Sequence, residues 1–136
     1  MKVIAKMRGV TLLADWAPKQ GFKLGSKDIE KKQTYLGSQV WRNPRMEIMD
    51  HEVPEPGPEE VLIEVKACGI CGSDVHMAQP DDNGYIFYPG LTGFPAILGH
   101  EFSGVVVKAG LGAISKRTNK PFVPGEPVTA EEMLWC

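Results

Sequence analysis

The stretch that decides the fold covers residues 67–76 and reads Ala-Cys-Gly-Ile-Cys-Gly-Ser-Asp-Val-His. It follows residues 60–67, in which apolar side chains alternate with charged ones, as in a β-strand with one buried face. A thiol, a hydroxyl, a carboxylate and an imidazole are thus placed directly after a predicted strand. A second imidazole and a second carboxylate follow at His100 and Glu101, after Gly99.

These side chains include the types that bind zinc, since thiolates, imidazoles and carboxylates are its usual protein ligands. Cys71 lies where the predicted strand gives way to a turn, and His100 lies at the head of the next predicted strand. We expect the two side chains to meet over a shared cleft and to act as zinc ligands. Zinc there would lower the pKa of a bound alcohol, so that the alkoxide can release hydride.

Removal of the alcohol proton needs a path to solvent. Ser73 could accept this proton and His76 could pass it outward, because histidine titrates near neutral pH. Asp74 would fix the orientation of a ligating histidine. Taken singly, His76 is more often a surface histidine and Glu101 a paired carboxylate at a strand edge. We expect Cys68 to be a small buried hydrophobic residue.

The rest of the chain predicts an all-β domain with little helix. Further strands are expected at residues 6–16, 45–52, 101–108 and 127–130, with one or two helical turns at 71–79. The strand at residues 101–108 is expected to be buried through Val105, Val106 and Val107. Residues 116–124 are expected to form a polar turn.

Two segments leave alternatives open. Residues 17–38 are polar and indicate a solvated loop or one helical turn, or else an insertion that covers a substrate cleft or a subunit contact. Residues 80–95 are rich in aromatic side chains, proline and glycine, and indicate either a local hydrophobic plug or one wall of a substrate pocket.

Composition excludes several function classes. The 136 residues are 43% hydrophobic and 24% charged, which is ordinary for a globular protein. The net charge of −2 gives no reason to expect nucleic acid or a membrane surface as a partner. No apolar run approaches the roughly 18 residues of a membrane span. Three cysteines do not describe a disulfide framework, so we expect a cytoplasmic location.

Residues 69–76 and 99–104 resemble the two signatures of the zinc-containing medium-chain alcohol dehydrogenase superfamily. Residues 54–62 resemble the lead-in strand of that family, and residues 125–128 resemble its Gly-Asp-x-Val turn, with glutamate in place of aspartate. The resemblance covers residues 39–136. It is strongest to polyol-type members, in particular to the branch that acts on inositol-derived ketones such as scyllo-inosose.

The resemblance implies a mainly β fold, a GroES-like and partly open barrel with short helices. Residues 1–38 would supply an N-terminal strand and a polar insertion to the same domain, and residues 39–136 the zinc-binding catalytic part. It further implies that the site residues fall into three groups. The first group is the catalytic zinc ligands Cys71 and His100, with Glu101 in or near the zinc shell. The second is the proton relay of Ser73 and His76, with Asp74 as the supporting carboxylate. The third is Cys136 alone, as the first ligand of a structural zinc lobe.

The implied activity is oxidation of a secondary alcohol on a polyol or cyclitol, with NAD(P) as hydride acceptor and a dimer or tetramer as the full-length form. Residues 110–115 lack the third glycine and the acidic residue of a dinucleotide-binding loop. We therefore expect a truncated chain without its Rossmann domain and third zinc ligand, inactive by itself. The alternative is a non-catalytic GroES-like assembly module with a relic zinc site.

Overall fold

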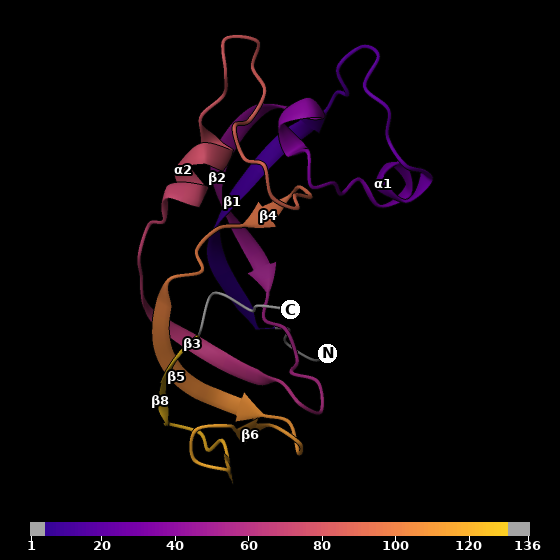
Figure 1. Cartoon of the computed structure of the whole chain (residues 1–136). Coiled ribbons are helices and arrows are strands. Elements are labelled where there is room, and N and C mark those ends of the chain that lie inside the picture. The colour runs from indigo at the N-terminus through magenta and orange to yellow at the C-terminus, as the bar shows by residue number, and fades with distance from the viewer. Residues whose placement is uncertain (1–4, 131–136) are drawn as a thin grey trace. The chain divides into compact units, whose positions relative to one another are not determined.

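The computed structural model describes residues 5–130, which fall into two compact units (Figure 1). Unit one takes its described residues from Met1–Met7, Glu52–Gly69 and Gly99–Cys136. Unit two consists of Arg8–His51 and Ile70–Leu98. The chain therefore passes between the units several times, and neither unit is a continuous segment.

Unit one is built on an antiparallel sheet in the order β3-β5-β8. Its strands are β3 (Val61–Cys68), β5 (Phe102–Ala109) and β8 (Pro127–Thr129). The pairing of β3 with β5 runs from Val61 opposite Ala109 to Cys68 opposite Phe102, with two register shifts. These strands confirm the strands predicted at residues 60–67 and 101–108, but β3 lacks the predicted buried face, because none of its residues is buried and Val65 is 53% exposed.

A short hairpin continues unit one after β5. Strands β6 (Ile114–Ser115) and β7 (Lys120–Pro121) pair antiparallel, where the sequence predicted only a polar turn. Asn119 has a φ of 54°, in the left-handed region that asparagine tolerates better than most residues. That conformation lets the chain reverse within four residues.

Unit two is built on the sheet order β2-β1-β4. Strand β1 spans Lys6–Trp16, β2 spans Trp41–Glu52 and β4 spans Ala96–Ile97, so β1 and β2 each run slightly beyond the unit. Strand β2 begins four residues before the predicted start at residue 45. Asn43, at a φ of 55°, and Pro44 interrupt the alternation there and hide the strand in the sequence.

Asn43 also links β2 to β1. Its side-chain amide donates to Asp15 at 3.1 Å, and Arg45 donates to the other oxygen of the same carboxylate at 3.1 Å. These two hydrogen bonds, with Asn43 contributing most, hold the pKa of Asp15 below its ordinary value. The group is exposed, so the contribution to stability is small.

The core of unit two lies around Trp41, which is 2% exposed. Its ring meets Trp16 edge-on at 4.9 Å between centroids and Phe94 at 5.0 Å. Val40 and Ile86 complete the buried cluster. Partly buried side chains pack around it: Ala14, Trp16, Phe22, Leu24, Tyr88 and Phe94. Aromatic residues from the strands and from the predicted plug thus share one core.

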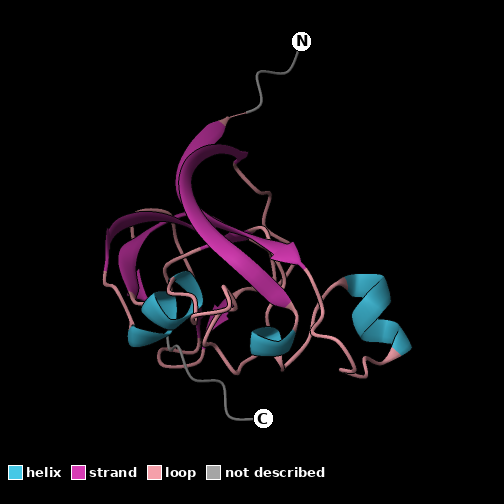
Figure 2. Ribbon diagram, turned by 90° about the horizontal axis from the view of Figure 1, so that it is seen from above, coloured by secondary structure: helices cyan, strands magenta, loops and turns pink. Residues whose placement is uncertain are grey.

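The helices are short, as the sequence predicted (Figure 2). They are α1 (Ser26–Lys31), η1 (Gly37–Gln39) and α2 (Gly72–Ala78). Helix α1 buries no side chain, which agrees with a solvated segment containing one helical turn or slightly more. Backbone hydrogen bonds from Ala17 to Val40 and from Lys19 to Gln39 fasten the beginning of this segment to the core. No helix within residues 5–130 is long and apolar enough to cross a membrane.

Residues 80–95 form the local plug that the sequence left as one of two alternatives. Tyr88 and Phe94 pack on the core, and the Tyr85 hydroxyl donates to the Ala17 carbonyl at 2.9 Å. The Lys19 ammonium lies 4.6 Å from the centre of the Tyr85 ring. Phe87 differs from the others, because 60% of its surface is exposed.

Two expectations about burial are wrong. Cys68 is exposed, as are the four residues before it in β3, because this half of the strand is not covered within the described part of the chain. Val105, Val106 and Val107 were expected to be buried together. Only Val106 is, because neighbouring residues of a strand point to opposite faces and this sheet has a solvated side.

We predict that Trp41→Ala lowers the free energy of unfolding by about 3–5 kcal/mol, since it empties the centre of the unit-two core. Phe87→Ala is the matched control and should cost about 0.5 kcal/mol or less, because the ring is mostly exposed. Urea unfolding followed by circular dichroism measures both. Equal losses in the two variants would contradict this placement of the core.

Candidate metal centre

The first group of predicted site residues lies at the start of α2 in unit two. Cys71 is the residue before the helix, with extended backbone angles of −85° and 155°. Asp74 is 8% exposed, and its carboxylate accepts a hydrogen bond from the Cys71 backbone N–H at 3.0 Å. The Asp74 N–H in turn donates to the Cys71 carbonyl at 3.1 Å. This reciprocal pair is a helix-capping arrangement that fixes the backbone from which the Cys71 thiol projects.

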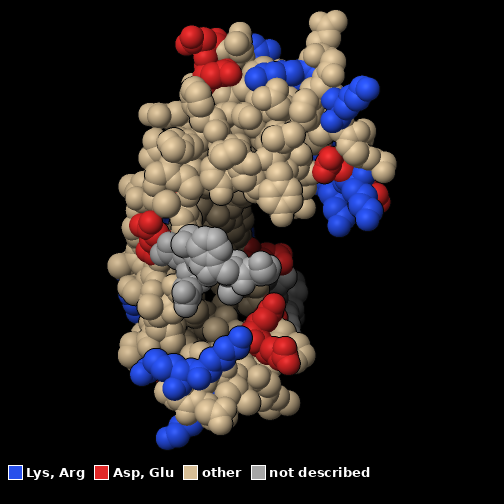
Figure 3. All heavy atoms as spheres, viewed as in Figure 1, with Lys and Arg blue, Asp and Glu red and all other residues tan. Residues whose placement is uncertain are grey.

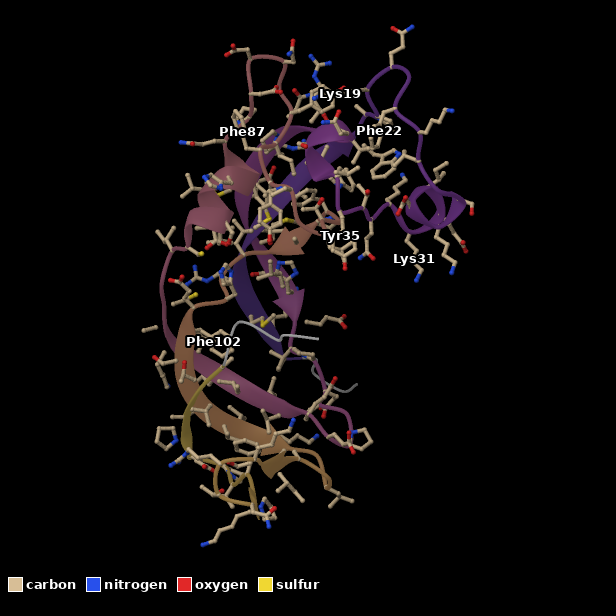
Figure 4. The ribbon with its side chains drawn as sticks, in the orientation of Figure 1. Lys19, Phe22, Lys31, Tyr35, Phe87 and Phe102 are labelled. Atoms are coloured by element: carbon tan, nitrogen blue, oxygen red, sulfur yellow. The ribbon has the colours of Figure 1, made fainter. Side chains whose placement is uncertain are left out.

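Ser73 and His76 lie on the same short helix, three residues apart. Residues at this spacing face the same side of a helix, as a relay between the two side chains requires. Ser73 is half-buried and His76 is exposed, so the order runs from interior to solvent. The His76 carbonyl accepts a hydrogen bond from the Phe87 N–H at 3.1 Å, which places Phe87 beside α2 (Figure 4).

The second group lies in unit one and begins at Gly99. This residue has a φ of 102°, and a Cβ added there would lie 2.7 Å from the Cys68 sulfur. Only glycine suits both the backbone angle and the space. The half-buried His100 follows Gly99 directly, so the conformation of Gly99 and its closeness to Cys68 fix where the His100 backbone begins.

Glu101 is held by Gly69. The Gly69 N–H donates to the Glu101 carbonyl at 2.8 Å, which extends the β3–β5 pairing by one step. A Cβ on Gly69 would lie 2.8 Å from a carboxylate oxygen of Glu101, so this side chain occupies space that the glycine leaves open. Phe102, the next residue, begins β5 (Figure 4).

A cavity of about 300 Å³ opens in unit one beside Glu101. Its lining comes from the ends of β3, β5 and β8: Ala67, Cys68, Gly69, Glu101, Phe102, Ser103 and Thr129. Cys68 is therefore an exposed thiol at a cavity, a feature that sequence reasoning missed. The sequence signal that could have indicated an exposed Cys68 is its place directly after the strand predicted at residues 60–67.

The predicted site residues thus form two local arrangements. The structure joins Cys71 to Asp74 on α2 of unit two, with Ser73 and His76 on the same helix. It joins Glu101 to Gly69, and Gly99 to Cys68, in unit one. Cys136, the predicted structural zinc ligand, lies outside the described residues. The assignment of zinc ligands and relay residues stays a prediction.

Comparison with known proteins decides the family. The sequence of residues 57–136, more than half of the chain, matches the family model of the alcohol dehydrogenase GroES-like domain. The chain belongs to this family. The relationship to dehydrogenases and the mainly β, GroES-like fold with short helices, both predicted from the sequence, are confirmed.

Within this family, the chain is similar to several named dehydrogenases and to a solved structure. Over 96% of its length the chain is 67% identical to scyllo-inosose 3-dehydrogenase of Thermotoga maritima, and it covers 33% of that protein. It is 38% identical to a sorbitol dehydrogenase of Gallus gallus over 68% of its length, covering 23% of the relative. A solved structure from Thermotoga maritima, provisionally described as an alcohol dehydrogenase, matches 95% of the chain with a TM-score of 0.82 and 67% identity; the chain covers 33% of it. The chain thus spans about a third or less of the length of these relatives.

We predict that Gly99→Ala lowers the free energy of unfolding by about 1–3 kcal/mol, because alanine is strained at this backbone angle and meets the Cys68 sulfur. The loss should shrink when Cys68→Ala is added, since the contact with sulfur is then removed. Gly72→Ala is the matched control. Open space surrounds Gly72 at the start of α2, so stability should hold or rise by about 0.4–1 kcal/mol. Denaturant titration of the three variants and the wild type measures these differences, and a Gly99→Ala protein as stable as wild type would contradict the account.

Proposed function

We propose that this chain is the zinc-binding catalytic part of a dehydrogenase that oxidises a secondary alcohol of a polyol or cyclitol, with NAD(P) as hydride acceptor. The observation that carries the proposal is the hydrogen bond between Gly69 and Glu101. Cys71 is two residues beyond Gly69, so its Cα lies within about 7.6 Å of the Gly69 Cα by chain connectivity alone. We propose that Cys71, His100 and Glu101 serve one zinc ion.

The donor set suits zinc. Cys71 offers a sulfur, His100 a ring nitrogen and Glu101 a carboxylate oxygen. A thiolate with nitrogen and oxygen donors is within the ligand range of zinc. When bound, zinc would supply the Lewis acidity that lowers the pKa of the substrate alcohol.

The residues of α2 would handle the proton. Ser73, half-buried at the first turn, would accept the hydroxyl proton of the substrate, and the exposed His76 would release it to solvent. Asp74 would hold Cys71 in place through the backbone hydrogen bond at 3.0 Å. All three residues with these roles, Ser73, Asp74 and His76, lie on the short helix α2.

The polyol or cyclitol substrate rests on the relatives, which are named scyllo-inosose and sorbitol dehydrogenases. We further propose that residues 1–136 by themselves do not supply the dinucleotide-binding domain and the third catalytic ligand that the family resemblance implies. We therefore propose that these residues alone do not bind NAD(P) or turn over substrate. A cytoplasmic location and a dimeric or tetrameric full-length enzyme are part of the same proposal.

Cobalt substitution tests the ligand assignment. We expect Co²⁺ added to the chain to give a thiolate-to-cobalt charge-transfer absorption band, because Cys71 contributes sulfur to the site. Cys71→Ser should abolish the band, and Cys68→Ser, the matched control, should leave it unchanged. Loss of the band in Cys68→Ser with retention in Cys71→Ser would overturn the assignment. A chain that binds no Co²⁺ or Zn²⁺ would favour the alternative of a non-catalytic module.

Asp74→Asn should weaken Zn²⁺ binding by about 10–100-fold, as changes to residues that support metal ligands commonly do. The affinity is measured by competition with a chromophoric chelator. Glu64→Gln is the matched control, because this exposed carboxylate on β3 pairs only with Lys66 among the described residues. Equal affinities in wild type and Asp74→Asn would show that the capping carboxylate does not support the site.

Calorimetric titration with NAD⁺ and with NADH tests the claim that residues 1–136 alone do not bind the dinucleotide. We expect no saturable heat from the 136-residue chain with or without Zn²⁺. Saturable binding of either dinucleotide would contradict it.

A further inference from the structure

A buried hydroxyl lies in the central strand of the unit-two sheet, outside the proposed site. Unlike the charged side chains that stand out on the surface in Figure 3, Thr11 on β1 is 1% exposed. Its hydroxyl lies 2.7 Å from the Nε2 nitrogen of His51, the half-buried residue next to the end of β2. A hydroxyl can donate or accept, so this hydrogen bond forms with either tautomer of the ring. His51 thus supplies the partner that the buried hydroxyl needs, since an unpaired one is costly.

The His51 ring reaches Thr11 over a glycine. Gly9 precedes Thr11 by two residues and shares its face of β1, because side chains alternate along a strand. A Cβ on Gly9 would lie 3.4 Å from Cδ2 of His51 and 3.0 Å from Cγ2 of Ile97. The Gly9 carbonyl also lies 3.4 Å from the Thr11 hydroxyl, a longer contact than that with His51. The missing side chain thus lets β2 and β4 approach one point of β1, and we call Gly9, Thr11, His51 and Ile97 the strand lock.

The strand lock holds a strand that has little pairing of its own. Strand β4 has two residues, which pair with Thr11 and Leu12 of β1. One further backbone hydrogen bond, from the Leu98 N–H to the Val10 carbonyl at 2.9 Å, extends this pairing. A ladder this short gains little from backbone hydrogen bonds alone, because each of them replaces hydrogen bonds to water. Side-chain contacts within the strand lock are therefore needed to hold β4 in place.

The segment that β4 holds leads directly to a proposed zinc ligand. Leu98 is the last residue of unit two, and Gly99 and His100 are the next two residues of the chain. A ligand group binds more tightly when its backbone is already placed, because less conformational freedom is lost on binding. The anchoring of Leu98 therefore bears on how well His100 is preorganised for a metal ion.

We propose that Thr11 and His51 are positioning residues for the metal centre, because their hydrogen bond holds β4 and β4 holds the approach to His100. The inference rests on the proposed function, in which His100 binds zinc. Filling of the core does not explain the pair, since valine would occupy the place of Thr11 without a polar group that needs a partner. Neither residue binds the metal, and both act through the backbone of β4.

Amide hydrogen exchange of the metal-free chain, followed by NMR, tests the strand lock. Thr11→Val keeps the shape of the side chain and removes the hydroxyl, so the Leu98 N–H should exchange about five- to tenfold faster. Thr11→Ser keeps the hydroxyl and should restore slow exchange. Thr34→Val is the matched control, because Thr34 is also buried in unit two and its hydroxyl accepts a local hydrogen bond from the Leu36 N–H at 3.2 Å. Exchange at Leu98 should not change in this variant.

Zinc affinity tests the positioning role. Thr11→Val should weaken Zn²⁺ binding by about tenfold or more, as measured by competition with a chromophoric chelator. His51→Phe, which keeps a ring without its nitrogens, should behave in the same way. Thr11→Ser should bind zinc nearly as the wild type does, and Thr34→Val should be unchanged. A general loss of stability would instead affect both valine variants alike.

The outcomes separate this inference from the proposed function. Faster exchange at Leu98 together with weaker zinc binding in Thr11→Val supports the positioning role. Unchanged exchange in that variant would overturn the strand lock. Faster exchange with wild-type zinc affinity would overturn the positioning role and leave the proposed function standing. A wild-type chain that binds no zinc would overturn the proposed function, and the positioning role with it.

Discussion

The hydrogen bond from the Gly69 N–H to the Glu101 carbonyl is the constraint on which the candidate centre depends. It adds one step to the pairing of β3 with β5, at the point where β3 ends and β5 begins, and it joins a residue of each sequence signature. Because Gly69 has no side chain, the Glu101 carboxylate can lie against it. Cys71, two residues further along, cannot move far from that point. A strand pairing thus joins the backbones of Gly69 and Glu101, some thirty residues apart in the chain.

Strands with regular alternation could be predicted from the sequence. Residues 60–67 and 101–108 form β3 and β5 nearly as expected, and the helix at residues 71–79 is α2. Asn43 and Pro44 hid the start of β2, because a left-handed residue and an imino acid break the periodic pattern. Cys68 was assigned to the interior from residue type, which carries no information about where a strand ends. The division into two interleaved units depends on contacts between distant residues, which a local pattern cannot report.

The sequence offers the candidate site residues, whose roles stay predictions, but not all of the contacts that hold them in place. The spacing of Cys71 and Asp74 matches a capping position, so the hydrogen bond between them was open to prediction. The contact of Cys68 with Gly99 was not, since it joins the end of one strand to the approach of another. The relatives are named scyllo-inosose and sorbitol dehydrogenases, and on α2 Ser73 is half-buried while His76 is exposed, the order that the proposed proton path requires.

The central claim is that Cys71 is the one sulfur ligand of a metal centre completed by nitrogen and oxygen donors from His100 and Glu101. X-ray absorption at the zinc edge of the zinc-loaded chain tests it most directly. The account predicts a single sulfur at about 2.3 Å with the remaining scatterers at about 2.0–2.2 Å. Two sulfurs, which would bring in Cys68 or Cys136, or a shell with no sulfur, would contradict it.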